Sequence, residues 1–132
     1  MKEVLGCGID IEEPARFRKK IPAPGHTTSF VRLVYTDAEI ERNLRFCPAI
    51  SFPLGFSCKE AFFKSFGLSW TNSGISWKDI ALFFAEADDL QNYSVRLSGY
   101  AMELFREKKC RSFESFLEYN PDYVIFQVVL FS

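Results

Sequence analysis

The sequence predicts one small α+β domain in which helices pack on a mainly antiparallel sheet. Apolar segments rich in β-branched and aromatic residues alternate along the chain with segments of helical spacing. The chain has 132 residues, of which 48% are hydrophobic, and this is enough apolar surface for one core. No internal repeat is present, and the only stretch rich in proline and glycine, residues 21–28, is too short to separate two domains. We therefore expect residues 1–132 to form a single domain.

The N-terminal segment predicts a buried strand followed by a helix. "EVLGCGIDI", residues 3–11, is almost continuously apolar. "EEPARFRKK", residues 12–20, begins with acidic residues and ends with basic ones, which is the charge order that the helix dipole favours. Asp10 is then expected where the strand ends.

Two further helices are predicted in the middle of the chain. Thr36 and Glu39 form a T-x-x-E capping box, which predicts a helix over about residues 37–46. Pro48 is expected to end it. A second helix is predicted from about residue 53 to residue 67, with a proline at its start and a glycine at its end.

The second half of the chain predicts three strands and one helix. The strands are rich in aromatic and β-branched residues and comprise residues 76–87, 92–98 and 123–131. Between the last two strands, "GYAMELFREKKC" has apolar residues at helical spacing. "DDLQN" and "YNPD" predict turns.

Charge and cysteine content argue against several classes of function. The formal net charge is −1, with 16 basic and 17 acidic side chains, so no overall field recruits nucleic acid or an anionic membrane. The four cysteines contain no Cys-x-x-Cys pair and the only histidine is His26, so we expect free buried thiols and neither a zinc site nor a disulfide framework. No run approaches the roughly 18 apolar residues of a membrane span, and a cytoplasmic location is expected.

The stretch "GFSCKEAFFKSFG", residues 55–67, places Glu60 and Lys64 four residues apart on the predicted helix. Glu60 shares a helix side with Phe56 and Phe63, an unfavourable place for a carboxylate without a role. Two interpretations stay open. The pair is either a reactive site beside the core or an ordinary i,i+4 salt bridge worth about 0.2–0.5 kcal/mol.

Asp10 also allows two interpretations. A carboxylate at the end of an apolar strand is well placed to face a cleft, but Asp is also a good N-cap for the next helix. Gly6 and Gly8 in the same strand are expected to permit close packing against a neighbouring strand.

Together these two segments resemble the 4′-phosphopantetheinyl transferases, in particular the short holo-[acyl-carrier-protein] synthase type. "GCGIDIEEPARF" is similar to the family pattern G-x-D-I-x-E-x-x-R-[IF], and "FSCKEAFFKSFG" is similar to F-x-x-K-E-A-x-x-K-x-x-G. Weaker similarity in "FVRLVYTDAEI", "ISWKDIAL", "VRLSGYAMELF" and "DYVIFQVVLF" extends over nearly the whole chain. The order and separation of the two motifs make the pair fairly specific.

The resemblance implies transfer of 4′-phosphopantetheine from coenzyme A to a serine of an apo acyl carrier protein. It implies Mg²⁺ as cofactor, held by Asp10 and Glu60, with carboxylate and phosphate oxygens as ligands. Glu60 would accept the serine proton and Lys64 would stabilise the leaving phosphate. Lys64 and Gly67 would contact coenzyme A, and Arg16 would bind the acidic recognition helix of the carrier protein.

The chain differs from the short-type pattern on the cofactor side. Gly55 stands where arginine is frequent, residues 68–74 replace a glycine-rich turn, and Glu118 and Tyr119 stand where a Ser-His pair is frequent. These differences leave the affinity for coenzyme A and the preferred acyl-CoA open, and they keep a second hypothesis, a non-catalytic family member that binds carrier domains.

The sequence also predicts an oligomer, and the resemblance implies a homotrimer. The chain holds 15 phenylalanines, and the C-terminal strand lacks a clear alternation with polar residues. One sheet-and-helix core does not readily bury this apolar surface, and a surplus of this kind marks an interface.

Overall fold

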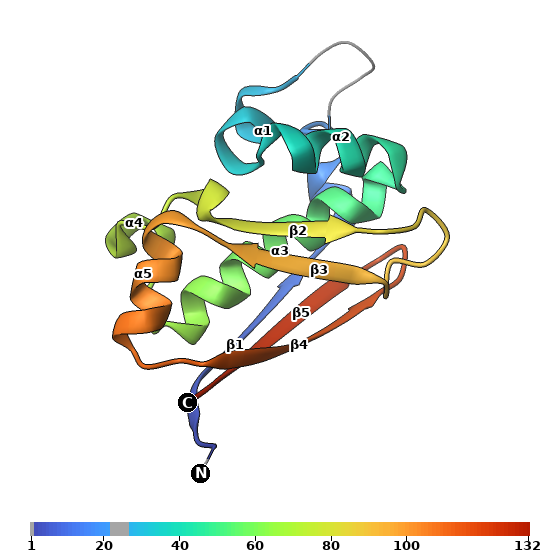
Figure 1. The fold of residues 1–132 in the computed structure, drawn as a ribbon. Coiled ribbons are helices and arrows are strands. Elements are labelled where there is room, and N and C mark those ends of the chain that lie inside the picture. The colour runs from blue at the N-terminus through green and yellow to red at the C-terminus, as the bar shows by residue number, and fades with distance from the viewer. Residues whose placement is uncertain (1, 22–26) are drawn as a thin grey trace.

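The computed structural model describes residues 2–21 and 27–132, and it shows two antiparallel sheets with helices around them (Figure 1). The larger sheet has the order β1-β5-β4, with β1 at Val4–Glu12, β5 at Val124–Phe131 and β4 at Ser112–Tyr119. The smaller sheet pairs β2 (Ile80–Phe84) with β3 (Tyr93–Leu97). The α+β class and the antiparallel pairing are confirmed, but the predicted single sheet is divided into two.

The helical elements differ in several places from those predicted. They are η1 (Pro14–Phe17), α1 (Ser29–Val34), α2 (Asp37–Arg45), α3 (Pro48–Ser65), α4 (Trp70–Ser73), η2 (Trp77–Asp79) and α5 (Gly99–Glu107). The helix predicted over residues 12–20 is wrong, because Glu12 still pairs with Val124 in β1 and only one 3-10 turn follows. The sequence analysis also missed α1 and β4.

The capping box that begins α2 is confirmed, whereas the predicted start of α3 is wrong. The Thr36 side chain accepts a hydrogen bond from the Glu39 backbone N–H, and Glu39 accepts one from the Thr36 N–H in return. Pro48 both follows α2 and occupies the first turn of α3, where its missing N–H costs nothing. Pro53 therefore lies inside α3.

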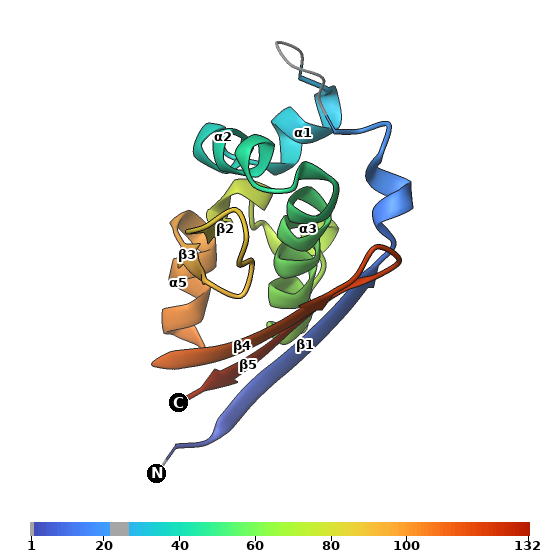
Figure 2. The same cartoon turned by 90° about the vertical axis from the view of Figure 1, so that its right-hand side faces the viewer.

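Helix α3 lies between the two sheets and is buried on nearly all sides (Figure 2). Gly6 and Gly8 allow β1 to contact it, and not a neighbouring strand as predicted. A Cβ on Gly8 would lie 1.9 Å from the Ala61 carbonyl oxygen, and one on Gly6 would lie 2.1 Å from that of Ser65. The two glycines therefore bring the backbone of β1 against α3.

A buried ion pair fixes α3 against its other neighbours. Lys59 and Glu39 are both 0% exposed, and the Lys59 Nζ lies 3.0 Å from the Glu39 Oε1. The same ammonium donates to the carbonyl oxygens of Trp77, at 3.0 Å, and Ile80. The second carboxylate oxygen of Glu39 accepts from the Leu82 N–H. Burial lowers the pKa of Lys59, and the adjacent carboxylate opposes that shift. The pair thus joins α2, α3 and β2 at one point.

The cysteine prediction is confirmed in part. All four thiols are free, with Cys58 and Cys110 buried, but Cys7 and Cys47 are exposed. Burial raises the pKa of the Cys58 thiol, so this side chain remains neutral. His26 lies outside the described residues.

Replacing one member of the ion pair should destabilise the fold strongly. We expect Lys59→Met to lower the free energy of unfolding by about 3–5 kcal/mol, because the Glu39 carboxylate is then buried without its cation. The double variant Lys59→Met/Glu39→Leu should lose less than the sum of the two single variants. Urea denaturation monitored by circular dichroism measures all three. Additive losses would show that the two side chains act independently, and Lys78→Met, an exposed lysine in η2, is the matched control.

Candidate active site

Asp10 and Lys64 meet where β1 lies against α3. The Lys64 Nζ lies 2.9 Å from the Asp10 Oδ1 and donates a second hydrogen bond, at 3.1 Å, to the Ile9 carbonyl oxygen. Within the described residues Lys64 makes no ion pair with Glu60. The interpretation as an ordinary i,i+4 salt bridge is therefore wrong, and so is the N-cap interpretation of Asp10, because this residue pairs with Phe126 inside β1.

Three carboxylates share this junction. Burial raises the pKa of Glu60, the nearby Asp10 charge raises it further, and Lys64 lowers it. Burial also raises the pKa of Glu12 from its ordinary value of 4.5 to about 8, and the neighbouring Asp10 and Glu60 carboxylates raise it further. Three carboxyl groups and one lysine are therefore crowded at the edge of the core, and Glu12 keeps its proton up to about pH 8.

The sequence analysis did not identify Glu12 as part of the site. The two-residue period of a strand could have identified it. Residues two apart in a strand face the same side, so Glu12 lies on the face of β1 that carries Asp10. Because a helix was predicted over residues 12–20, Glu12 was not assigned to the strand that carries Asp10.

The residues at this junction suit a hard divalent cation. Asp10 is 7% exposed, and its Oδ2 is buried without a hydrogen-bond partner among the described residues. No group of three or more His, Cys, Asp or Glu side chains in those residues is arranged closely enough to hold a metal ion unaided. Mg²⁺ does not require such a cage, because it commonly takes one or two carboxylates and fills its shell with water and phosphate oxygens. An open set of carboxylates fits that chemistry.

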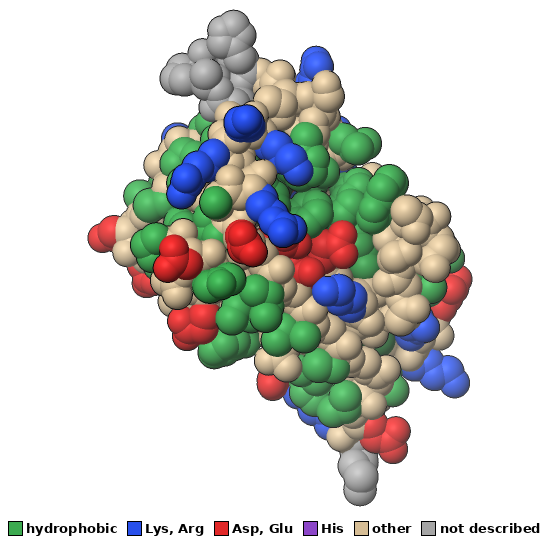
Figure 3. Space-filling model, turned by 180° about the vertical axis from the view of Figure 1, so that it is seen from behind, with side chains coloured by type: hydrophobic (Ala, Val, Ile, Leu, Met, Phe, Trp, Pro, Cys, Tyr) green, Lys and Arg blue, Asp and Glu red, His purple; other side chains and the backbone are tan. Residues whose placement is uncertain are grey.

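The remaining predicted site residues lie at the two ends of this junction. Gly67 follows the end of α3 with φ +75°, and nothing lies within 4 Å of a Cβ placed on it. Arg16 is exposed in η1, and its nearest acid is Glu13, at 3.9 Å. Figure 3 shows one face of the molecule on which acidic side chains gather near the middle, with basic side chains on either side of them.

The differences from the short-type pattern have structural consequences. Gly55 is buried, and a Cβ there would lie 3.0 Å from the Tyr35 ring. That ring is held in place, because the Tyr35 hydroxyl donates a 2.6 Å hydrogen bond to the Phe52 carbonyl oxygen. A long side chain at position 55 would therefore have to displace Tyr35. Residues 70–73 of the replaced glycine-rich turn form α4.

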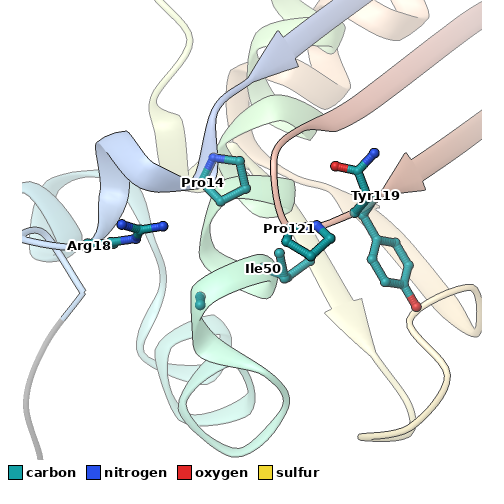
Figure 4. Close-up of a pocket in the computed structure, with 7 residues that line it drawn as sticks. Pro14, Arg18, Ile50, Tyr119 and Pro121 are labelled. Carbon is teal, nitrogen blue, oxygen red and sulfur yellow. The ribbon is translucent and has the colours of Figure 1, made fainter.

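Tyr119, at the end of β4, borders a pocket of about 580 Å³ (Figure 4). Pro14, Arg18, Ile50 and Pro121 also line it, so η1, the start of α3 and the β4–β5 turn all contribute. The lining is mainly apolar, and Arg18 supplies its positive charge. The pocket lies beside the end of β1, because Tyr119 pairs with Val124 and Val124 pairs with Glu12.

The chain is similar in sequence to several bacterial proteins of one activity. The holo-[acyl-carrier-protein] synthase of a Geobacter species is 36% identical over 109 residues, which cover 79% of each chain. Those of Trichlorobacter lovleyi and Geotalea daltonii are 30% and 29% identical, and the matches cover 96% of this chain and 97% and 98% of theirs. Within the described residues, no helix has the length and apolar character to cross a membrane.

Solved structures share the fold. The Neisseria meningitidis holo-[acyl-carrier-protein] synthase superposes with a TM-score of 0.78 at 18% identity, over 97% of this chain and 98% of that one. The Helicobacter pylori synthase, in complex with coenzyme A, gives 0.73 at 22% identity over 94% and 98%. The family model of the 4′-phosphopantetheinyl transferase superfamily matches residues 6–128. Since that match spans nearly the whole chain, the protein belongs to the 4′-phosphopantetheinyl transferase superfamily.

Proposed function

We propose that this protein transfers 4′-phosphopantetheine from coenzyme A to a serine of an apo acyl carrier protein. The relatives named holo-[acyl-carrier-protein] synthase support this reaction. The observation that carries the proposal is the contact of Lys64 with Asp10, beside the Glu12 and Glu60 carboxylates. An ordinary surface would not gather three carboxylates and a lysine at the edge of a core, because the like charges repel.

The groups at the junction match the steps of the reaction. The serine oxygen attacks the β-phosphorus of coenzyme A, the bond from that phosphorus to the bridging oxygen breaks, and adenosine 3′,5′-bisphosphate leaves. Glu60 accepts the serine proton, for which its raised pKa suits it. Lys64 stabilises the charge that develops on the leaving phosphate. Asp10 orients the Lys64 ammonium through the 2.9 Å contact.

We propose Mg²⁺ as the cofactor, with Asp10 and Glu60 as its carboxylate ligands and Glu12 beside them. When bound, the cation would supply charge neutralisation to the diphosphate. Gly67 would let a phosphate group approach the end of α3, because it carries no side chain. Arg16 is exposed and has only a 3.9 Å contact with the exposed Glu13, so it would pair with a carboxylate of the carrier protein.

Glu60→Gln and Lys64→Ala should each remove most of the transfer activity while the fold remains cooperative. Mass spectrometry of an apo carrier protein incubated with coenzyme A and Mg²⁺ detects the added phosphopantetheine on its serine. We expect the addition with the wild-type protein and its loss on chelation of the divalent cation. If no carrier is modified but one still binds in a pull-down, the protein is the non-catalytic binding module instead. Glu103→Gln, in α5, is the control for losing one carboxylate.

Divalent cation should stabilise the protein more at pH 8 than at pH 5.5. Because the pKa of Glu12 is raised in the folded state, that state keeps a proton between pH 4.5 and about 8 that the unfolded chain releases. The cation-free protein should therefore lose stability as pH rises through this range. Mg²⁺ favours the ionised carboxylates and should reverse that loss. Urea denaturation with and without Mg²⁺, at matched ionic strength, measures the effect, and Glu60→Gln should reduce it. An Mg²⁺ effect that is equal at the two pH values would contradict the proposed ligands.

We further propose that the protein is a homotrimer that buries the outer face of the β1-β5-β4 sheet. Ile9 and Phe116 both pair with Gln127, so the three side chains form one row across that face. Ile9, Ile11 and Phe116 are 49%, 56% and 54% exposed, and such an array of apolar groups on one sheet face marks an interface. The surplus of apolar residues inferred from the sequence thus gathers where a second copy could cover it.

The variant Ile9→Asp/Phe116→Asp should therefore be a monomer and should lose transfer activity if subunits complete one another's sites. Sedimentation velocity measures the assembly state, and the carrier assay measures turnover. Leu33→Asp is a matched control, because Leu33 is 58% exposed but lies on α1. A wild-type protein that sediments as a fully active monomer at the assay concentration would contradict the trimer proposal.

A further inference from the structure

The two sheets meet along β3 and β4 without forming one continuous sheet. Within the described residues, β3 pairs only with β2, and β4 pairs only with β5. At one end their edges are joined by side chains: the Tyr93 and Ser115 hydroxyls lie 2.8 Å apart, and the Gln91 amide donates to the Leu117 carbonyl oxygen. In Figure 1, β3 runs toward α5 and β4 leads away from it. The split therefore leaves two unpaired strand edges facing the same space.

At the other end of these strands a groove of about 610 Å³ opens between them. Its apolar lining includes Val95 on β3, Met102 on α5 and Phe113 on β4. Every second backbone N–H and C=O of an edge strand points away from its partner strand and is free to pair with another chain. Residues 94–97 of β3 line the groove, so this edge supplies most of its free backbone groups.

Positive charge surrounds the groove. Arg96 and Arg111 line its two sides, and neither forms an ion pair with an acid among the described residues. Arg96 also borders a smaller hollow with Arg42, where the two guanidinium carbons lie 5.4 and 5.7 Å from the Phe83 ring. Arg111 borders a third hollow with Lys109. Basic side chains thus lie on both sides of the groove, in a chain whose net charge is −1.

The unpaired strand edge, the apolar lining and the basic side chains together indicate which kind of ligand the groove binds. The basic side chains repel a second copy of the same edge, which is how natural proteins protect edge strands from self-association. They attract carboxylates, and Arg in particular holds a carboxylate through two hydrogen bonds. The apolar floor stabilises only a ligand that also carries apolar groups. A free strand edge, finally, binds an extended backbone.

We propose that the groove between β3 and β4 binds an extended peptide segment of a partner protein, in which acidic and apolar residues alternate. The segment adds as a strand to the edge of β3. Its carboxylates pair with Arg96 and Arg111, and its apolar side chains pack on Val95, Met102 and Phe113. This site is separate from the Asp10–Lys64 junction and does not depend on the transfer reaction.

A fluorescein-labelled peptide of alternating Glu and Val residues is the probe, and fluorescence anisotropy with the whole protein measures binding. We expect the double variant Arg96→Glu/Arg111→Glu to weaken binding by at least about tenfold, since it reverses the charge on both sides. Arg32→Glu, on an exposed arginine of α1, should bind like the wild type. The double variant should keep its phosphopantetheine transfer activity. Equal binding by all three proteins would overturn the proposal.

A second measurement separates strand addition from simple charge attraction. The same peptide with alternate backbone nitrogens methylated keeps its charge but loses N–H donors, so its affinity should fall at least about tenfold. Hydrogen exchange should show new protection of Val95 and Leu97, whose N–H groups face away from β2, when the unmodified peptide binds. If the methylated peptide binds equally well, or if inorganic polyphosphate binds more tightly than the peptide, the groove is a polyanion site and the proposal is wrong.

Discussion

The buried ion pair of Lys59 and Glu39 is the contact on which the arrangement of the rest of the structure depends. Two charges removed from water are stable only when every acceptor and donor around them is used. Here the Lys59 ammonium has three oxygen acceptors, and both Glu39 carboxylate oxygens accept hydrogen bonds. The two charged side chains come from α2 and α3, and the backbone groups that pair with them include those of η2 and β2. Rotating α3 about its axis would break several of them at once, so the orientation of α3 is determined by this pair.

That orientation decides what Glu60 can do. Lys59 and Glu60 are adjacent in the sequence, and in a helix adjacent side chains point about 100° apart. When Lys59 faces Glu39 in the interior, Glu60 is turned toward β1. Gly6 and Gly8 then remove the side chains that would hold β1 away from α3, so that Asp10 comes within 2.9 Å of Lys64. The fully hydrogen-bonded Lys59–Glu39 pair on one side of α3 thus helps to hold Asp10, Glu60 and Lys64 together on the other side.

The sequence identified those residues of the candidate site that stand in local motifs. Asp10, Glu60 and Lys64 stand in two short motifs, and the capping box of α2 is likewise a local pattern. The Lys59–Glu39 pair joins residues 20 positions apart, and no periodicity indicates which buried lysine meets which glutamate. The roles of β4 and of the divided sheet were missed for a related reason. Strand pairing depends on contacts between distant segments. In β4, the apolar Phe116 and the charged Glu118 are two residues apart and share a face, so alternation does not indicate which face is buried.

The division into two sheets also explains how a small chain keeps a rigid site. A single five-stranded sheet would give α3 one face to pack on, whereas the two sheets enclose it, and twelve of its residues are buried. The catalytic groups proposed here therefore stand on a strand and a helix of the core, and not on loops. Such placement holds the repelling carboxylates in register without help from a ligand. The same division leaves the edges of β3 and β4 unpaired, so that the feature that rigidifies the site also creates a second binding surface.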